Sequence, residues 1–173
     1  MSLKEFSIPG KTRASLDELF KRHRDASAVV ILPDQKPALA LDLPPHEAVS
    51  TSQAEAWVQA RDSADEPAIL NWAIWWIDLH SDNHAWPQTT LAQLRDRHVD
   101  ELLLLLSGPD RATVLESGMK AMALGLKGET LEEDPTSGTW ALYRHSLHDY
   151  KHTPDWLNPR NWANPEMWDK YRW

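Results

Sequence analysis

Apolar residues recur along this chain mostly at helical spacing. In the clearest block, apolar side chains repeat every three or four positions and would fall on one face of an α-helix: Ile69, Trp72, Ala73, Trp76 and Leu79. Trp75 and Ile77 widen that face until such a helix is apolar nearly all round, which is typical of the centre of a protein. The pattern therefore predicts a central helix from Pro67 to His80.

Five further segments are expected to be helical. Two begin with capping boxes, in which a serine and a glutamate three residues later satisfy each other's free backbone amides; these are Ser15–Glu18 and Ser52–Glu55. The others begin with a capping threonine or follow a proline-containing turn, and carry apolar residues at helical spacing. The expected ranges are 15–24, 52–61, 90–106 with a bend near His98, 110–127, and 139–152.

Two short apolar runs around a turn-rich loop predict a small β-hairpin at residues 28–42. Acidic and turn-forming residues at 129–138 predict an exposed loop. The expected fold class is mainly α, a single-domain bundle of about six helices over residues 1–152. An irregular, proline-rich and tryptophan-rich tail is expected at 153–173.

The tail repeats one short pattern. In three places a Thr or Asn precedes a proline, and a tryptophan follows within three residues. Thr or Asn before Pro is typical of a helix start, so three short turns are expected, each carrying one tryptophan. A tail of this kind needs tertiary contacts, in its own domain or in a partner. The candidate partner-binding residues are Trp156, Trp162, Trp168 and Trp173.

Composition and charge restrict the class of protein. The 173 residues fit one domain, and the absence of cysteine excludes disulfides and thiolate metal sites. A net charge of −8 argues against nucleic-acid binding, and the basic residues within 11–24 are interpreted as a solvated helix face. No stretch approaches the ~18 apolar residues of a membrane span, and the first residues do not resemble a signal peptide. We expect an acidic, cytoplasmic protein of bacterial type that does not bind membranes.

Three histidines form the strongest candidate for a metal site. His145, His148 and His152 are three and four residues apart, which places them on one stripe of the helix predicted at 139–152. Neutral imidazoles on such a stripe suit zinc or another divalent ion. Histidines that face water at the rim of an amphipathic helix are the alternative interpretation.

Other catalytic motifs are missing. His80 and His84 have the spacing of a zinc-protease helix, but Ser81 stands where that motif needs a glutamate. Asp78, His80, Asp82 and His84 alternate, yet a helix end with a dipole-stabilised histidine is the simpler interpretation. The chain also lacks a Gly-x-Ser-x-Gly elbow and a glycine-rich phosphate loop.

The functional hypothesis depends mainly on the tryptophans. Trp72, Trp75 and Trp76 are interpreted as core, whereas the tail tryptophans could anchor an interface. We expect a non-enzymatic interaction module without a cofactor, such as an adaptor, chaperone, assembly factor or immunity-like inhibitor. Its partner would be another protein or a second copy of the chain. The alternative is a zinc-binding protein or metal-dependent enzyme centred on His145, His148 and His152.

Overall fold

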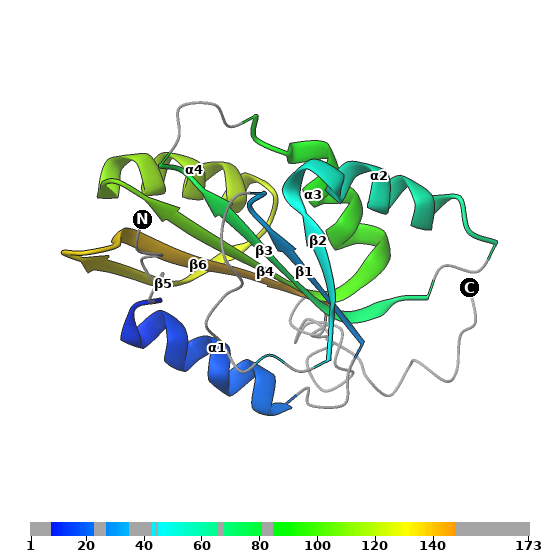
Figure 1. Cartoon of the computed structure of the whole chain (residues 1–173), viewed down its shortest axis with the longest axis horizontal. Coiled ribbons are helices and arrows are strands. Elements are labelled where there is room, and N and C mark those ends of the chain that lie inside the picture. The colour runs from blue at the N-terminus through cyan, green and yellow to red at the C-terminus, as the bar shows by residue number, and fades with distance from the viewer. Residues whose placement is uncertain are drawn as a thin grey trace, which may run out of the picture.

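The computed structural model describes residues 8–22, 27–34, 43, 45–65, 68–80 and 85–147. These residues form a six-stranded mixed sheet with helices on both faces (Figure 1). The helical elements are α1 (Gly10–Arg22), α2 (Thr51–Asp62), α3 (Gln88–Gln93), the π-helical turn η1 (Leu94–His98) and α4 (Arg111–Ala123). The strands are β1 (Ala28–Leu32), β2 (Glu47–Ser50), β3 (Leu70–Asp78), β4 (Val99–Gly108), β5 (Lys127–Asp134) and β6 (Gly138–Ser146). The prediction of a mainly α bundle is therefore wrong, and the chain has an α/β fold.

The strand order is β2-β1-β3-β4-β6-β5. Strand β1 pairs in parallel with both β2 and β3, and β3 pairs in parallel with β4. From β1 the chain passes to β2 on one side and then returns through α2 to β3 on the other side. The order thus reverses between β1 and β3. In open α/β sheets, ligands bind at such a reversal, outside the carboxyl ends of the strands.

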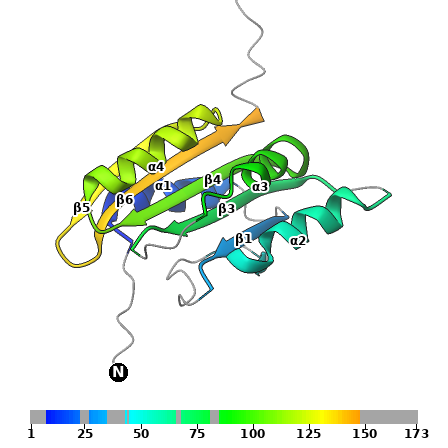
Figure 2. The ribbon, with the colours of Figure 1, turned by 90° about the horizontal axis from the view of Figure 1, so that it is seen from above.

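Strands β5 and β6 form an antiparallel hairpin that joins the sheet through β6. Figure 2 shows β6, β4, β3 and β1 side by side in this order. Because β6 runs opposite to the four parallel strands, its first residues lie at their carboxyl ends. Thr139 and Trp140 accordingly pair with Gly108 and Ser107, the last residues of β4.

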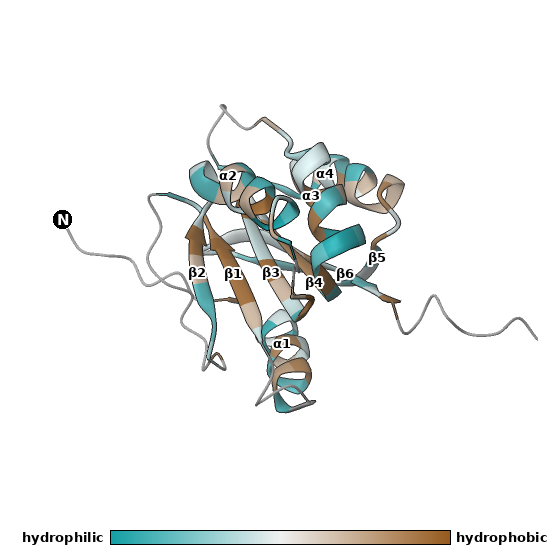
Figure 3. Ribbon diagram, turned by 90° about the vertical axis from the view of Figure 1, so that its right-hand side faces the viewer, coloured by the Kyte–Doolittle hydropathy of each residue, from teal (hydrophilic) through white to brown (hydrophobic). Residues whose placement is uncertain are grey.

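The central strands of the sheet are buried on both faces. On β3, Trp75 and Ile77 belong to the core beneath α2, α3 and α4, whereas Trp72, Ile74 and Trp76 belong to the core beneath α1. Figure 3 shows the apolar strands between α1 on one face and the other helices on the opposite face. A strand buried on both faces has a continuous apolar run and not an alternating one. This burial accounts for the sequence of β3 and of β4.

Three of the predicted helices are wrong because of this double burial. The predicted helix at 67–80 is β3, the second half of the one at 90–106 is β4, and the one at 139–152 is β6 as far as Ser146. When nearly every residue is apolar, some always match helical spacing, so periodicity does not separate a buried strand from a helix. Trp72, Trp75 and Trp76 are core residues as predicted, although they lie on a strand.

Other boundaries are partly as predicted. The helices at 52–61 and 110–127 are confirmed by α2 and α4, and the first helix by α1, which begins at Gly10 and not at Ser15. The hairpin at 28–42 is wrong, because β1 lies between two parallel strands; residues 35–42 are outside the described part of the chain. The loop expected at 129–138 is largely strand β5. Residues 153–173 are also outside the described part.

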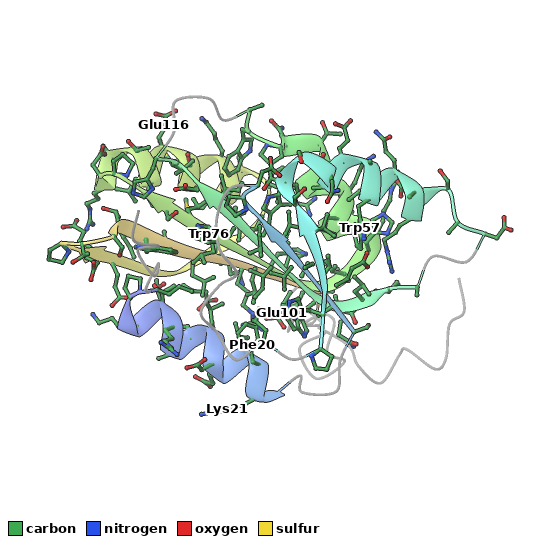
Figure 4. All side chains as sticks on the ribbon, viewed as in Figure 1. Phe20, Lys21, Trp57, Trp76, Glu101 and Glu116 are labelled. Carbon is green, nitrogen blue, oxygen red and sulfur yellow. The ribbon has the colours of Figure 1, made fainter. Side chains whose placement is uncertain are left out.

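Helix α1 is fixed to the sheet at both its ends. Near its C-terminus, the ring of Phe20 lies 5.3 Å from that of Trp72 (Figure 4). At its N-terminus, the Glu132 carboxylate accepts hydrogen bonds from the amides of Lys11 and Thr12 at 3.1 and 2.8 Å. Partial burial would raise the pKa of Glu132, but these bonds outweigh it and the pKa is lowered. A negative carboxylate here also suits the helix dipole.

Among the helices in the described part of the chain, none combines the length and hydropathy needed to cross a membrane.

Candidate functional site

Polar residues follow the apolar strands directly at the carboxyl edge of the sheet. Asp34 comes just after β1, Asp78 is the last residue of β3, and Ser107 and Gly108 end β4. Parallel strands end at the same edge, so these residues meet there although they are far apart in sequence. Asp34 and Asp78 lie on the two sides of the reversal in strand order.

The centre of this edge is a hydrogen-bonded pair, Asp78 and His80. The Nδ1 atom of His80 lies 2.6 Å from Oδ1 of Asp78. The hydroxyl of Ser107 donates to the same carboxylate oxygen at 3.2 Å. The carboxylate is mostly buried, with the Asp78 side chain 12% exposed, whereas the imidazole of His80 is 31% exposed and reaches solvent. A carboxylate that holds Nδ1–H leaves Nε2 as the ring atom that can accept a proton.

Gly138 makes room for the His80 ring, and Gly108 makes room for Val114 of α4. A Cβ atom on Gly138 would lie 3.1 Å from Nε2 of His80 and 2.3 Å from the carbonyl oxygen of Gly108. Gly138 also has a φ of 85°, in the left-handed region that favours glycine. A Cβ atom on Gly108 would lie 2.8 Å from Val114 and 3.4 Å from Leu79. The backbones of β4 and β6 can therefore approach each other closely beside the imidazole.

The chain's own carboxylates occupy the helix N-termini at this edge. Oδ1 of Asp34 accepts from the amide and hydroxyl of Ser52, in the first turn of α2, at 3.1 and 2.9 Å. Asp110 caps α4 by accepting from the amide and hydroxyl of Thr113, at 2.9 and 3.1 Å. These hydrogen bonds lower the pKa of both aspartates, so both are ionised near neutral pH. An anionic ligand group would have to displace a carboxylate to use either helix end.

Two stacked tryptophans support the pair from the face that α1 covers. The rings of Trp76 and Trp140 lie 5.6 Å apart, and the Trp76 indole N–H donates to the hydroxyl of Ser107 at 2.9 Å. The Trp140 indole N–H donates to Ser137 at 3.0 Å, whose own hydroxyl donates to Asp134 at 3.0 Å. Figure 4 shows Trp76 in the interior of the molecule. A connected polar network thus runs inward from the exposed imidazole.

Only one of the three predicted metal ligands lies in the described part of the chain. His145 lies on strand β6, with Nδ1 3.5 Å from the carbonyl oxygen of Gly125, and the helical stripe on which the prediction depended is absent up to Ser146. His148 and His152 lie outside the described residues, as do Trp156, Trp162, Trp168 and Trp173. Within the described residues, no three His, Asp or Glu side chains are grouped to hold a metal ion.

Asp78 and His80, interpreted from the sequence as a helix end, lie at the end of strand β3 and just after it. The useful signal was their position directly after an apolar run, shared with Asp34, Ser107 and Gly108. Polar residues that end several buried strands indicate a carboxyl-edge site once the strands are recognised. Residues 81–84, which include His84, are outside the described part.

Comparison with known protein families gives a match over nearly the whole chain. A family model matches residues 11–173. The chain belongs to this family, described as a family of unknown function (DUF6231). No curated protein matches the sequence. Among solved structures, a SAM-dependent methyltransferase from Aquifex aeolicus is similar with a TM-score of 0.44 and 10% identity, over 76% of this chain and 88% of that one. We draw nothing about function from a likeness at this level.

Proposed function

We propose that the protein binds a small molecule without phosphate at the carboxyl edge of its parallel strands. The observation that carries this proposal is the bonded set of Asp78, His80 and Ser107, which joins the ends of two neighbouring strands and leaves the imidazole partly open to solvent. A mostly buried carboxylate that orients a partly exposed histidine is an arrangement found at functional sites.

The charge of the edge defines the class of ligand. The N-termini of α2 and α4, which would be natural phosphate sites, already hold the carboxylates of Asp34 and Asp110. A further anion would be repelled by these aspartates and by Asp78. Hydroxyl groups and positive charge are favoured instead, because carboxylates and imidazole accept hydrogen bonds. The ligand class is therefore a cationic or polyhydroxylated compound.

His80 gives this site a chemical capability beyond binding. With Nδ1 bonded to Asp78, its Nε2 can accept a proton from a bound hydroxyl or amine, as a general base does. The proton moves from the ligand heteroatom to Nε2, and the adjacent carboxylate stabilises the resulting imidazolium. Such a step would prepare the ligand for group transfer or for addition to an electrophile.

The test is a binding measurement with probes that differ in one chemical feature. S-adenosylmethionine has ribose hydroxyls and a sulfonium charge, S-adenosylhomocysteine lacks the charge, spermidine lacks the hydroxyls, and ATP adds phosphates. We expect at least one of the three phosphate-free probes to raise the melting temperature and ATP to leave it unchanged, since a ligand stabilises the state that binds it. Stabilisation by ATP, or by none of the phosphate-free probes, would contradict the proposal.

A protein-interaction function through the tail tryptophans is the second candidate. One observation among the described residues favours it, an exposed apolar stripe on α4 formed by Leu115, Met119 and Met122. Such a stripe suits the tryptophan-rich segment of a second copy of the chain, and this candidate therefore excludes a tail that packs on its own α4. This candidate function includes the expectation of a cytoplasmic location, which cell fractionation tests. A monomeric protein that captures no other protein through its tail would contradict the interaction function.

A further inference from the structure

Helix α4 has an apolar stripe that lies outside the core. The exposed fractions of Leu115, Met119 and Met122 are 39, 62 and 55%. Their spacing of four and three residues places them on one face of the helix. Only one other large apolar residue in the described part of the chain is comparably exposed, Ile69 at 60%. The stripe is therefore a local concentration of apolar surface and not the scattered exposure found on any protein.

The chain leaves β6 beside one end of this stripe. Strand β6 runs beneath α4, since a Cβ atom on Gly118 would lie 1.9 Å from the hydroxyl oxygen of Tyr143. Further along, Nδ1 of His145 lies 3.5 Å from the carbonyl oxygen of Gly125, just after α4 ends. Figure 2 shows that α4 and β6 run alongside each other and end on the same side. The last described residue, Leu147, thus lies close to the C-terminal end of α4.

The segment that follows has the reach and the chemistry to cover the stripe. Trp156 comes nine residues after Leu147, which allows about 30 Å of extended chain, whereas the 13 residues of α4 span about 20 Å. Residues 148–173 hold four acidic and four basic side chains, so the acidic domain does not repel them. The family match continues to Trp173, which makes the tail part of the sequence that defines the family.

We infer that residues 153–173 fold back within the same chain and pack their tryptophans on the α4 stripe. Tryptophan buries a large area with little loss of rotamer freedom, and the thioethers of Met119 and Met122 make favourable contacts with aromatic rings. The interaction is intramolecular because the tail starts next to the stripe, which gives it a high effective concentration there. The tail thereby completes the outer face of α4.

Pairs of engineered cysteines test this contact in the full-length protein. The chain has no cysteine of its own, so a variant with Glu116→Cys and one tail cysteine contains only two thiols. Glu116 is exposed beside the stripe, three residues before Met119 on α4. The tail positions Leu157→Cys, Ala163→Cys and Met167→Cys each adjoin a tryptophan without removing it. Mild oxidation followed by mass measurement under non-reducing conditions separates a disulfide within one chain from a disulfide-linked dimer.

The matched control is Glu55→Cys on α2. Glu55 is exposed and accepts a hydrogen bond from Gln59 four residues later, as Glu116 does from Lys120. We expect at least one tail cysteine to form an intramolecular disulfide with Glu116→Cys roughly tenfold faster than with Glu55→Cys. Equal rates with the two helices, or disulfide-linked dimers as the main product, would overturn the inference.

A second arm tests whether the stripe itself holds the tail. Adding Met119→Lys and Met122→Lys should remove the rate advantage, whereas adding Ile69→Lys should leave it intact. If the lysines prevent folding, as judged by circular dichroism, Met119→Ser and Met122→Ser take their place. A rate advantage that survives the loss of both methionines would also overturn the inference.

Discussion

The Nδ1 atom of His80 lies 2.6 Å from Oδ1 of Asp78, and the same oxygen accepts the hydroxyl of Ser107 from the next strand. One carboxylate at the end of β3 therefore fixes the imidazole and also ties β3 to β4. This arrangement makes the ring orientation a property of the sheet and not of a flexible loop. The orientation and tautomer of the His80 ring should therefore change when the chemistry of residue 78 changes, even if the shape of its side chain is kept.

Asp78→Asn should reverse the tautomer of His80. The carboxylate only accepts hydrogen bonds and so favours Nδ1–H, whereas an amide can donate to Nδ1 and place the proton on Nε2. Nitrogen-15 chemical shifts of the ring at a pH where it is neutral distinguish the two forms. His145, which lies at the opposite edge of the sheet, is the internal control. An unchanged His80 tautomer in the variant would show that Asp78 does not direct this ring.

His80→Gln should weaken binding of the phosphate-free probe that stabilises the wild type most. If His80 contacts the ligand, a loss of about tenfold in affinity, or about 1.4 kcal/mol, is expected from titration calorimetry. The control is His145→Gln, which should leave the dissociation constant unchanged. Equal affinities of the His80→Gln variant and the wild type would show that His80 does not contact the ligand.

Ser107→Ala should destabilise the fold without changing its shape. The hydroxyl of Ser107 accepts the indole N–H of Trp76, whose side chain is fully buried, and it donates to Asp78. Loss of a buried hydrogen-bond partner costs about 1–3 kcal/mol of unfolding free energy, measured by urea denaturation. At the exposed control Ser63→Ala we expect less than about 0.5 kcal/mol. Similar losses at the two positions would contradict a special role for the buried network.

The sequence predicts an element of this fold only where a local signal marks that element. Helices α2 and α4 were predictable because each has a polar start and one buried face, although the capping box of α2 is formed by Ser50 and Gln53 and not by Ser52 and Glu55 as predicted. Strands β3 and β4 were not, because burial on both faces removes the alternation by which strands are normally recognised. Their enrichment in tryptophan and isoleucine, or in consecutive leucines, fits a strand as well as a helix. Parallel pairing is also non-local, so no short window of sequence contains it.

Only part of the candidate site could be predicted from the sequence. Asp78 and His80 are two residues apart, and their pairing could be suspected from that spacing. Ser107 joins them only because β4 pairs with β3 in a register that places it opposite Asp78. Gly138 reaches the same point from β6, through an antiparallel pairing with β4. Long-range register of this kind follows from the packed sheet and not from any local motif.

Gly138→Ala should be strongly destabilising. The residue has a φ of 85°, and a Cβ atom would lie 2.3 Å from the carbonyl oxygen of Gly108. The backbone conformation alone costs of order 1 kcal/mol for alanine, and the clash adds to it. Gly10→Ala is the control, because a Cβ atom there meets nothing within 4 Å and alanine favours helix. Chemical denaturation of both variants checks the contrast, and a neutral Gly138→Ala would argue against the tight turn beside His80.

Acid should destabilise the protein through the aspartates at its helix ends. Hydrogen bonds lower the pKa of Asp34 and Asp110 from their usual 3.8, so the folded state favours the ionised forms. A lowered pKa gives stability that is present above the unfolded value and lost as the pH falls through the folded one. Urea denaturation from about pH 6 down to about pH 3 should show this loss. Asparagine caps a helix without charge, so Asp110→Asn should be less stable than the wild type near pH 6 and approach it near pH 3. The exposed control Asp65→Asn changes the net charge equally, and a matching pH profile for the two variants would attribute the effect to net charge and not to capping.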